Sequence, residues 1–222
     1  MSNIIQDIKA GHLANWLASF LESQRSGSDA MVPCGECTAC CTSSYFIHIK
    51  PSDQKTMERL PKEILFPAPG SPDGHYLLGY TEKGHCPMFQ EGKCSIYECR
   101  PLTCRQYDCR IFPATDLSLE HEGKPAISTQ IQRWEFDMST EQDKEVFNAL
   151  RLAAAFLEAY AHLFPKSFVP ARITQRAVMA IRIHDLFIGL SEQSMHEQAE
   201  KIAKSVTHQH ETLPGISSNK PD

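Results

Sequence analysis

The cysteines of this chain are concentrated in one segment, where their spacing suits metal binding. All nine lie between Cys34 and Cys109 of the 222 residues, and the densest group has the sequence P-C-G-E-C-T-A-C-C. Thiolates bind soft and borderline metal ions, and a two-residue spacer lets a tight turn direct two sulfurs at one centre. Buried structural cysteines would instead be scattered along the chain. The pattern therefore predicts a metal-binding core held by thiolates.

Spacing within this first group bears on the kind of metal centre. Cys34, Cys37 and Cys40 form two C-x-x-C spacings in series, which is typical of one edge of an iron–sulfur site such as a 4Fe-4S cluster. Zinc sites more often use two separated C-x-x-C pairs, so the series favours iron–sulfur while leaving zinc open. Adjacent side chains diverge, so Cys40 and Cys41 rarely bind the same ion. Either Cys41 is a ligand of a second centre, or one of the two cysteines is a free thiol.

A second group of cysteines can complete the coordination, and we expect the two groups to converge in space. Its members are Cys86, Cys94, Cys99, Cys104 and Cys109. Two four-coordinate centres would need about eight thiolates, so one cysteine of the nine is spare. Arg100 and Arg105 lie among these cysteines. They either donate hydrogen bonds to thiolates and offset their charge, or form surface salt bridges.

The order and spacing of the cysteines resemble a known family. Three stretches carry the resemblance, within roughly residues 34–112: C-G-E-C-T-A-C-C, G-H-C-P-M and G-K-C-S-I-Y-E-C-R-P-L-T-C-R. They resemble the YkgJ-type cysteine-cluster family (CxxCxxCC), whose members are described as zinc- or iron-chelating. The resemblance implies metal ligands at Cys34, Cys37, Cys40, Cys41, Cys86, Cys94 and Cys104. The stretch Tyr107-Asp108-Cys109-Arg110 looks like a subgroup extension that adds Cys109 as an eighth ligand. Cys99 lies where the pattern tolerates other residues, so it is the candidate spare.

Charge and hydropathy argue against several other kinds of protein. The net charge of −5 gives no long-range attraction to nucleic acid or to an anionic membrane, so neither is expected as a partner. The apolar runs are too short to span a bilayer, and residues 1–21 lack the basic start and continuous apolar stretch of a secretion signal. We therefore expect a cytoplasmic protein whose thiols stay reduced.

The sequence predicts an α+β fold in which a small, irregular, cysteine-rich core packs against helices at both ends of the chain. The expected segments are an N-terminal helix (1–24), the cysteine-cluster core with short strands (25–138), a helical C-terminal part (139–207) and a flexible tail (208–222). Apolar periodicity favours a helix over 3–22 and strands within 45–49 and 127–138. Four prolines within 61–75 indicate an ordered loop.

Three helices are predicted in the C-terminal part, each from an apolar stripe at helical spacing. The first begins after Ser139, which forms a capping-box pattern with Gln142, and it ends at Pro165. The second ends at Gly189, and the third begins with the pair Ser194 and Glu197.

Three functions fit the cysteine pattern, and the sequence leaves all three open. The first is metal binding, as an iron–sulfur cluster or zinc, in a process that the sequence does not identify. The second is a redox or transfer enzyme in which Cys41 or Cys99 reacts beside the metal centre, although no general base is recognisable. The third is a structural zinc module that presents the C-terminal helices to a protein partner.

Overall fold

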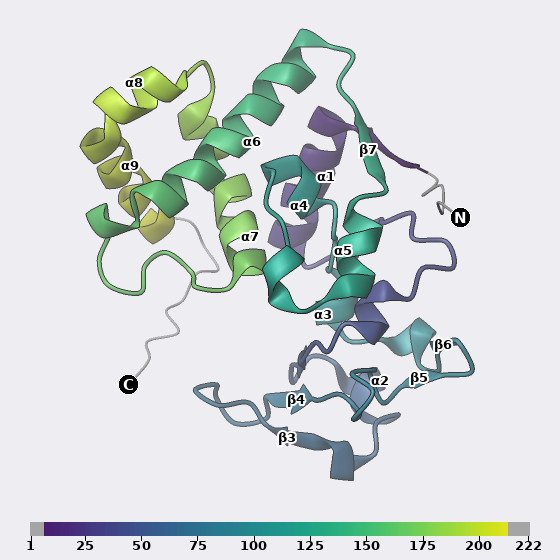
Figure 1. Ribbon diagram of the computed structural model, residues 1–222. Helices are drawn as coiled ribbons and strands as arrows, with labels where there is room; N and C mark the ends of the chain where they lie inside the picture. Colours follow the sequence, from purple (N-terminus) through teal and green to yellow (C-terminus); the bar gives the residue numbers. More distant parts are fainter. Residues whose placement is uncertain (1–6, 213–222) are drawn as a thin grey trace. The chain divides into compact units, whose positions relative to one another are not determined.

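The computed structural model describes residues 7–212, apart from the side chains of residues 121, 211 and 212. Over this range the chain has an α+β structure of helices and small sheets, as the sequence predicted (Figure 1). The described residues divide into two compact units. The helical unit comprises residues 7–21, 109–119 and 131–212, and the cysteine unit comprises residues 22–108 and 120–130. No helix among the described residues is long and apolar enough to cross a membrane.

The helical unit is built around one long helix, α6 (Glu141–Ala159), which Figure 1 shows beside α7, α8 and α9. Phe156 is fully buried, and its ring contacts Tyr160, Phe164 and Phe187 at centroid distances of 4.9, 6.0 and 5.4 Å. The surrounding elements are α4 (Ile111–Thr115), α7 (Ile173–Ile183), the 3-10 turns Ala161–Leu163 and His184–Phe187, α8 (Glu192–Glu197) and α9 (Ala199–Thr212). The apolar stripes predicted from the sequence therefore form the core of this unit.

The N-terminal segment differs from the predicted helix over 3–22. Within the described residues it begins as a strand, β1 (Ile8–His12), and helix α1 starts only at Leu13 and runs to Ser26. β1 pairs in parallel with β7 (Trp134–Asp137), and the register shifts between Lys9 and Gly11. Gly11 has a φ of +91°, which a helix does not contain. A partner strand more than a hundred residues away overrides the local helical pattern.

One buried carboxylate links the starts of two helices of this unit. Asp143 Oδ1 accepts a hydrogen bond from the Ala14 N–H at the start of α1, at 2.9 Å. Asp143 Oδ2 accepts one from the Thr140 hydroxyl at 2.6 Å, and the Asp143 N–H donates to Thr140 Oγ1 at 3.0 Å. Free N–H groups at a helix start need such acceptors. The N-cap of α6 is therefore Thr140 and not the predicted Ser139.

The cysteine unit consists of short elements around a small apolar core. Its three-stranded antiparallel sheet has the order β2-β4-β3, and its core contains the buried residues Ile49, Leu60, Leu78, Met88 and Ile96. The elements are β2 (Ile47–Ile49), α2 (Gln54–Met57), β3 (Leu65–Pro67), β4 (Tyr76–Leu78), β5 (Phe89–Gln90), β6 (Lys93–Cys94), α3 (Leu102–Arg105), α5 (Pro125–Ile131) and the 3-10 turns Ala39–Thr42, Lys62–Ile64, Tyr97–Cys99 and Glu120–Glu122. β3 lies within the segment predicted as a loop.

Two further segments differ in detail from the predictions. The alternating segment 127–138, predicted to contain one or two strands, contains one, β7, while α5 occupies its first part, with Pro125 in the first turn where its missing N–H costs nothing. The capping box near residue 194 pairs Ser191 with Ser194 and starts α8. Helix α9 continues to Thr212, into the segment predicted as a tail, and residues 213–222 of that tail lie outside the described residues.

Replacing Asp143 with alanine is expected to destabilise the helical unit, because the Ala14 N–H at the start of α1 loses its acceptor and the Thr140 hydroxyl, which caps α6, loses the carboxylate that orients it. Hydrogen bonds, first from the Thr140 hydroxyl and then from the Ala14 N–H, lower the pKa of Asp143 below the ordinary value of 3.8. A lowered folded-state pKa contributes stability that is present above the ordinary pKa and is lost as the pH falls through the lowered value. The melting temperature of D143A should therefore lie below that of the wild type at pH 7, with the gap closing below about pH 4.

The matched control is Glu141→Ala, which removes an exposed carboxylate from the same helical turn; its ion pair with Lys144 is solvent-exposed. Equal melting temperatures for D143A and E141A at pH 7 would contradict the capping role of Asp143.

Candidate metal centre

The first cysteine group is folded as two successive tight turns. The Cys37 N–H donates to the Cys34 carbonyl at 3.0 Å, and Gly35 between them has a φ of +55°, which glycine adopts without strain. The 3-10 turn Ala39–Thr42 then places Cys40 and Cys41, and the Cys41 N–H donates to the Thr38 carbonyl at 2.9 Å. Backbone hydrogen bonds thus hold the tight turns in which these closely spaced cysteines lie.

Backbone contacts join this group to the start of the second group. The Cys86 N–H donates to the Cys41 carbonyl at 2.8 Å, and the Ser44 N–H donates to the Gly84 carbonyl at 2.9 Å. A Cβ atom at residue 84 would lie 2.5 Å from Ser44 Oγ, and Gly84 also has a φ of +75°. Glycine suits residue 84, where the two backbone segments come this close together. The sequence pattern did not reveal this requirement.

A short hairpin positions Cys94. β5 pairs with β6, with Phe89 opposite Cys94, and the connecting residues Glu91 and Gly92 have φ values of +50° and +77°. Two consecutive positive φ values are the signature of a tight hairpin turn, for which glycine in the second position is favoured. The Glu91-Gly92 pair was the sequence signal for this hairpin.

Buried polar side chains fix the segment that carries Cys99 and Cys104. Asp53 accepts hydrogen bonds from the Leu102 N–H at 2.8 Å and the Lys50 N–H at 2.9 Å. The Thr56 hydroxyl donates to the Cys99 carbonyl at 2.6 Å, and the Thr103 hydroxyl donates to the His48 carbonyl at 2.7 Å. These residues support the site. Sequence reasoning missed them because each forms a hydrogen bond with a residue more than forty positions away in the chain.

Thiols from both groups lie close enough to change one another's pKa. The hydrogen bond with Cys41 lowers the pKa of Cys40 to about 7, and the same bond is the main cause that raises the pKa of Cys41. Burial and then neighbouring thiols, Cys40 among them, raise the pKa of Cys104. Burial is also the main cause that raises the pKa values of Cys86 and Cys94. The predicted convergence of the two groups is therefore confirmed for Cys40 and Cys41.

The remaining cysteines have different surroundings. Cys34 and Cys37 are half-buried, as is Cys99, which packs against the small apolar core beside Cys86 and Cys94 and contributes to the raised pKa of Cys94. Cys109 belongs to the helical unit, where it is buried and its Sγ accepts a hydrogen bond from Trp134 Nε1 at 3.1 Å. The ligand roles of Cys34, Cys37 and Cys109, and the role of Cys99 as the spare, stay predictions.

The donor set of the cluster fits a thiophilic metal. Six thiols, those of Cys40, Cys41, Cys86, Cys94, Cys99 and Cys104, interact electrostatically, and sulfur ligands select zinc or iron–sulfur centres over hard cations. Among residues 7–212, however, no three His, Cys, Asp or Glu side chains already surround one point as a metal site would require. Binding therefore requires side-chain rotations that turn the gathered sulfurs toward a common centre.

The two arginines of the second group have different partners. Arg105 Nη1 forms an ion pair with Asp29 Oδ1 at 2.5 Å, which matches the salt-bridge alternative. The Arg100 guanidinium instead stacks on the Tyr97 ring at 3.9 Å from its centroid, and its charge lowers the pKa of Cys40. The alternative of charge support for thiolates therefore applies to Arg100.

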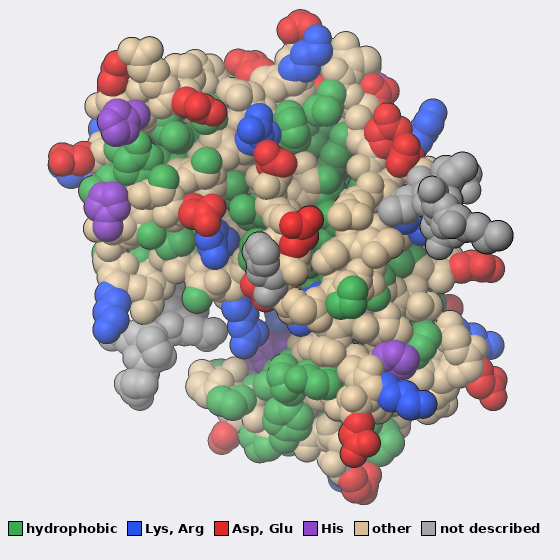
Figure 2. Space-filling model, in the orientation of Figure 1, with side chains coloured by type: hydrophobic (Ala, Val, Ile, Leu, Met, Phe, Trp, Pro, Cys, Tyr) green, Lys and Arg blue, Asp and Glu red, His purple; other side chains and the backbone are tan. Residues whose placement is uncertain are grey.

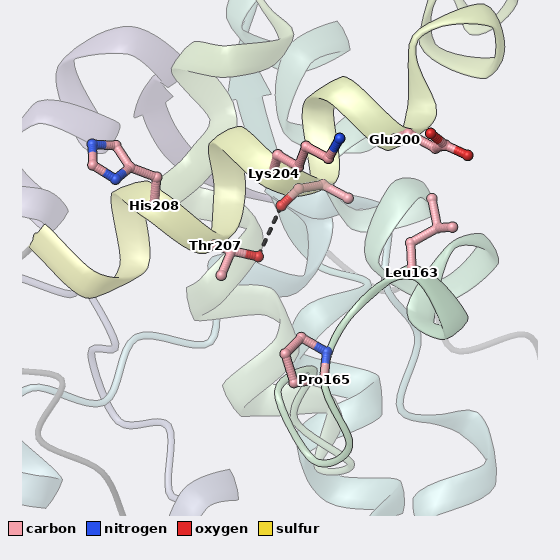
Figure 3. A pocket seen from close by; sticks show the side chains of 7 residues that line it. Leu163, Pro165, Glu200, Lys204, Thr207 and His208 are labelled. Carbon is pink, nitrogen blue, oxygen red and sulfur yellow. Dashed lines mark hydrogen bonds between the residues drawn. The ribbon is translucent and has the colours of Figure 1, made fainter.

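Two surface features lie outside the cysteines. Phe46, Phe66 and Tyr80 are 39–49% exposed, and the Phe46 ring contacts the rings of the other two. Figure 2 shows hydrophobic side chains gathered where Figure 1 places β3 and β4. In the helical unit, a shallow groove of about 470 Å³ lies between Leu163, Pro165 and one face of α9 (Figure 3). The Thr207 hydroxyl on that face donates to the Ala203 carbonyl at 2.9 Å. The predicted protein partner of the C-terminal helices stays a prediction.

Comparison with known proteins identifies the cysteine-rich part of the chain. Residues 33–137 match the model of the CxxCxxCC family, described as "Putative zinc- or iron-chelating domain". No curated protein and no solved structure gives a significant match. The match starts at the first cysteine group and extends through the second group to the end of β7. Residues 33–137 therefore match the family that the order and spacing of the cysteines predicted.

Proposed function

We propose that the clustered cysteines chelate iron as an iron–sulfur cluster, with zinc as the alternative metal. The observation that carries this proposal is the electrostatic influence that six thiols drawn from both cysteine groups exert within the cluster. Six neutral thiols need not have gathered around so small an apolar core, whereas a shared metal gives them a common partner. The serial C-x-x-C spacing supports iron–sulfur over zinc.

Each residue has a defined part in this proposal. Cys40 and Cys41 on their 3-10 turn, Cys86, Cys94 on its hairpin and Cys104 on α3 would supply sulfurs, together with Cys34, Cys37 and Cys109. When bound, the metal supplies the cross-links between these turns. The raised pKa values of Cys86, Cys94 and Cys104 mean that their protons must leave on binding, since the thiolate is the ligand.

The clustered cysteines suit a reducing compartment. Thiols that bind metal must stay reduced, and they do so where glutathione and thioredoxin are present. A cytoplasmic location is therefore part of the proposal.

One observation favours the enzyme alternative. Cys40 is exposed, and its pKa of about 7 leaves a large thiolate fraction at neutral pH. In a redox or transfer enzyme, Cys40 would thus be a better nucleophile than Cys41, whose pKa is raised. Labelling the metal-loaded protein with a thiol reagent separates the two functions: a metal ligand is protected, whereas a reactive thiol is modified.

The metal itself is tested by purification without oxygen. A protein with an iron–sulfur cluster should be brown, with broad absorption and with iron and acid-labile sulfide in similar amounts, because thiolate-bound iron absorbs visible light. A zinc protein would be colourless and would contain zinc by elemental analysis. Protein that contains neither iron nor zinc, and takes up neither on reconstitution, would contradict the proposal.

Metal removal is expected to loosen the cysteine unit before the helical unit. The cysteine unit has short strands and turns around five buried apolar residues, whereas fifteen buried residues form the core around α6. Binding energy at a thiolate site is also folding energy. After chelation, limited proteolysis should cut first within residues 34–108, while the fragment containing α6 and α7 persists. Unchanged cleavage of the cysteine unit after demonstrated metal loss would argue against a structural role for the metal.

Serine substitutions are expected to separate ligands from the spare cysteine. Cys104→Ser and Cys37→Ser should lose most of the bound metal, because a four-coordinate site then has an open position. Cys99→Ser should keep nearly all of it, at a cost in stability of about 1 kcal/mol or less from reduced packing. The measurements are metal content per chain and urea unfolding. Equal metal loss in C99S and C104S would show that Cys99 is a ligand, and would leave Cys41 or Cys109 as the free thiol.

A further inference from the structure

Two histidines of the cysteine unit lie in direct contact beside neighbouring strands. His48 is on β2, and His75 immediately precedes β4, which pairs with β2 in antiparallel register. His48 lies opposite Leu77, so His75, two residues before Leu77, is its diagonal neighbour on the same face of the sheet. His75 Nδ1 lies 2.9 Å from His48 Nε2, and the ring centroids are 5.0 Å apart. The two imidazoles therefore share one hydrogen bond.

Backbone contacts hold both histidines and leave their rings to each other. The His48 carbonyl accepts a hydrogen bond from the Thr103 hydroxyl at 2.7 Å. The His75 carbonyl accepts one from the Ala68 N–H at 3.0 Å, and the His75 N–H donates to the Pro72 carbonyl at 3.3 Å. Among the described residues, the only hydrogen bond of either ring is the one between them. Two donors on a fixed backbone are preorganised to hold a shared ligand.

The surroundings of the pair suit a bound cation. Both histidines are half-buried. Burial first, and then the charges of His75 and Lys50, lower the pKa of His48 below its ordinary value of 6.5, so this ring is neutral at pH 7. Neutral imidazole is the form that binds metal ions. The carboxylate of Asp53 acts on His48 in the opposite sense to Lys50, so the two nearby charges offset each other.

The distance between the two nitrogens matches one coordination geometry. Metal–imidazole bonds are about 2.0–2.1 Å long, so two nitrogens at a right angle around an ion lie about 2.9 Å apart, and two at the tetrahedral angle about 3.4 Å apart. The separation of 2.9 Å between His48 Nε2 and His75 Nδ1 agrees with the right angle. Ni(II) and Cu(II) prefer square-planar or tetragonal sites with such angles, whereas zinc prefers tetrahedral sites.

We propose that His48 and His75 chelate a metal ion of the nickel(II) or copper(II) class at the outer face of β2 and β4. The ion takes the place of the shared proton and binds His48 Nε2 and His75 Nδ1. The ring that donated that proton then carries a proton on its other nitrogen, so both rings stay neutral. No third His, Cys, Asp or Glu side chain of residues 7–212 converges there, so water fills the remaining positions. This nitrogen site is separate from the thiolates, and it does not depend on the proposed function.

The experiment measures nickel bound per chain by equilibrium dialysis of the full-length protein as purified. Ni(II) is the probe because thiols convert Cu(II) to Cu(I). His48→Gln and His75→Gln should each weaken one nickel site at least about tenfold, since even residues that only support a ligand are often worth that much. A chelate needs both rings, so the double variant should lose no more than either single variant does.

The matched control is His162→Gln, which removes one exposed imidazole from the helical unit and should bind nickel as the wild type does. Glutamine retains hydrogen-bonding groups at residues 48 and 75, and circular dichroism reports whether each variant folds. A second measurement needs no variant: nickel should protect His48 and His75 of the wild type from modification by diethyl pyrocarbonate, as mapped by peptide mass.

Three results would overturn the inference: wild-type nickel binding in both single variants, losses that simply add in the double variant, or modification of both histidines that nickel leaves unchanged. A protein whose cysteines hold neither iron nor zinc would contradict the proposed function and leave this test as it stands, because nickel binding is compared at the two histidines alone.

Discussion

The cysteine unit depends on a close approach of two backbone segments, at Cys41–Ser44 and Gly84–Cys86. Two hydrogen bonds, from the Cys86 and Ser44 N–H groups, hold the segments together. They bring the vicinal pair Cys40 and Cys41 into the neighbourhood of thiols that are more than forty residues away in the chain. No long strand or helix enforces this arrangement, so the absence of a side chain at Gly84 is a condition for assembling the site.

Around this junction, hydrogen bonds from polar side chains hold the backbone in place, a role that a large apolar core has in other proteins. Asp53 and Thr56 each use a side-chain oxygen to bind a backbone group near Cys104 or Cys99, and the Thr103 hydroxyl, next to Cys104, donates to the His48 carbonyl. Such hydrogen bonds are directional, so they fix where the backbone of a turn lies even when little apolar area is buried. The site thus combines a well-positioned backbone with side chains that must still rotate to surround a metal.

The sequence predicted the meeting of the two cysteine groups better than it predicted which distant segments pair with each other. Ligand counting anticipated that the two cysteine groups meet, because neither can complete two centres alone. The stripes of α6 and α7 were visible because their partners repeat at helical spacing. By contrast, β1 carries an apolar pattern compatible with a helix, and only its pairing with β7 decides the outcome. The roles of Asp53, Gly84 and Asp143 were also hidden, since each depends on one specific atom of a residue distant in the sequence.

The order of the two units along the chain links their stabilities. The chain leaves the helical unit after residue 21 and returns at Cys109, so the cysteine unit is inserted between α1 and α4. Folding of the helical unit must therefore close a long loop, and the entropy lost in closing a flexible loop grows with its length. Cross-links that order the inserted segment reduce the conformational freedom of that loop. Occupancy of the cluster would then lower the entropic cost of pairing β1 with β7.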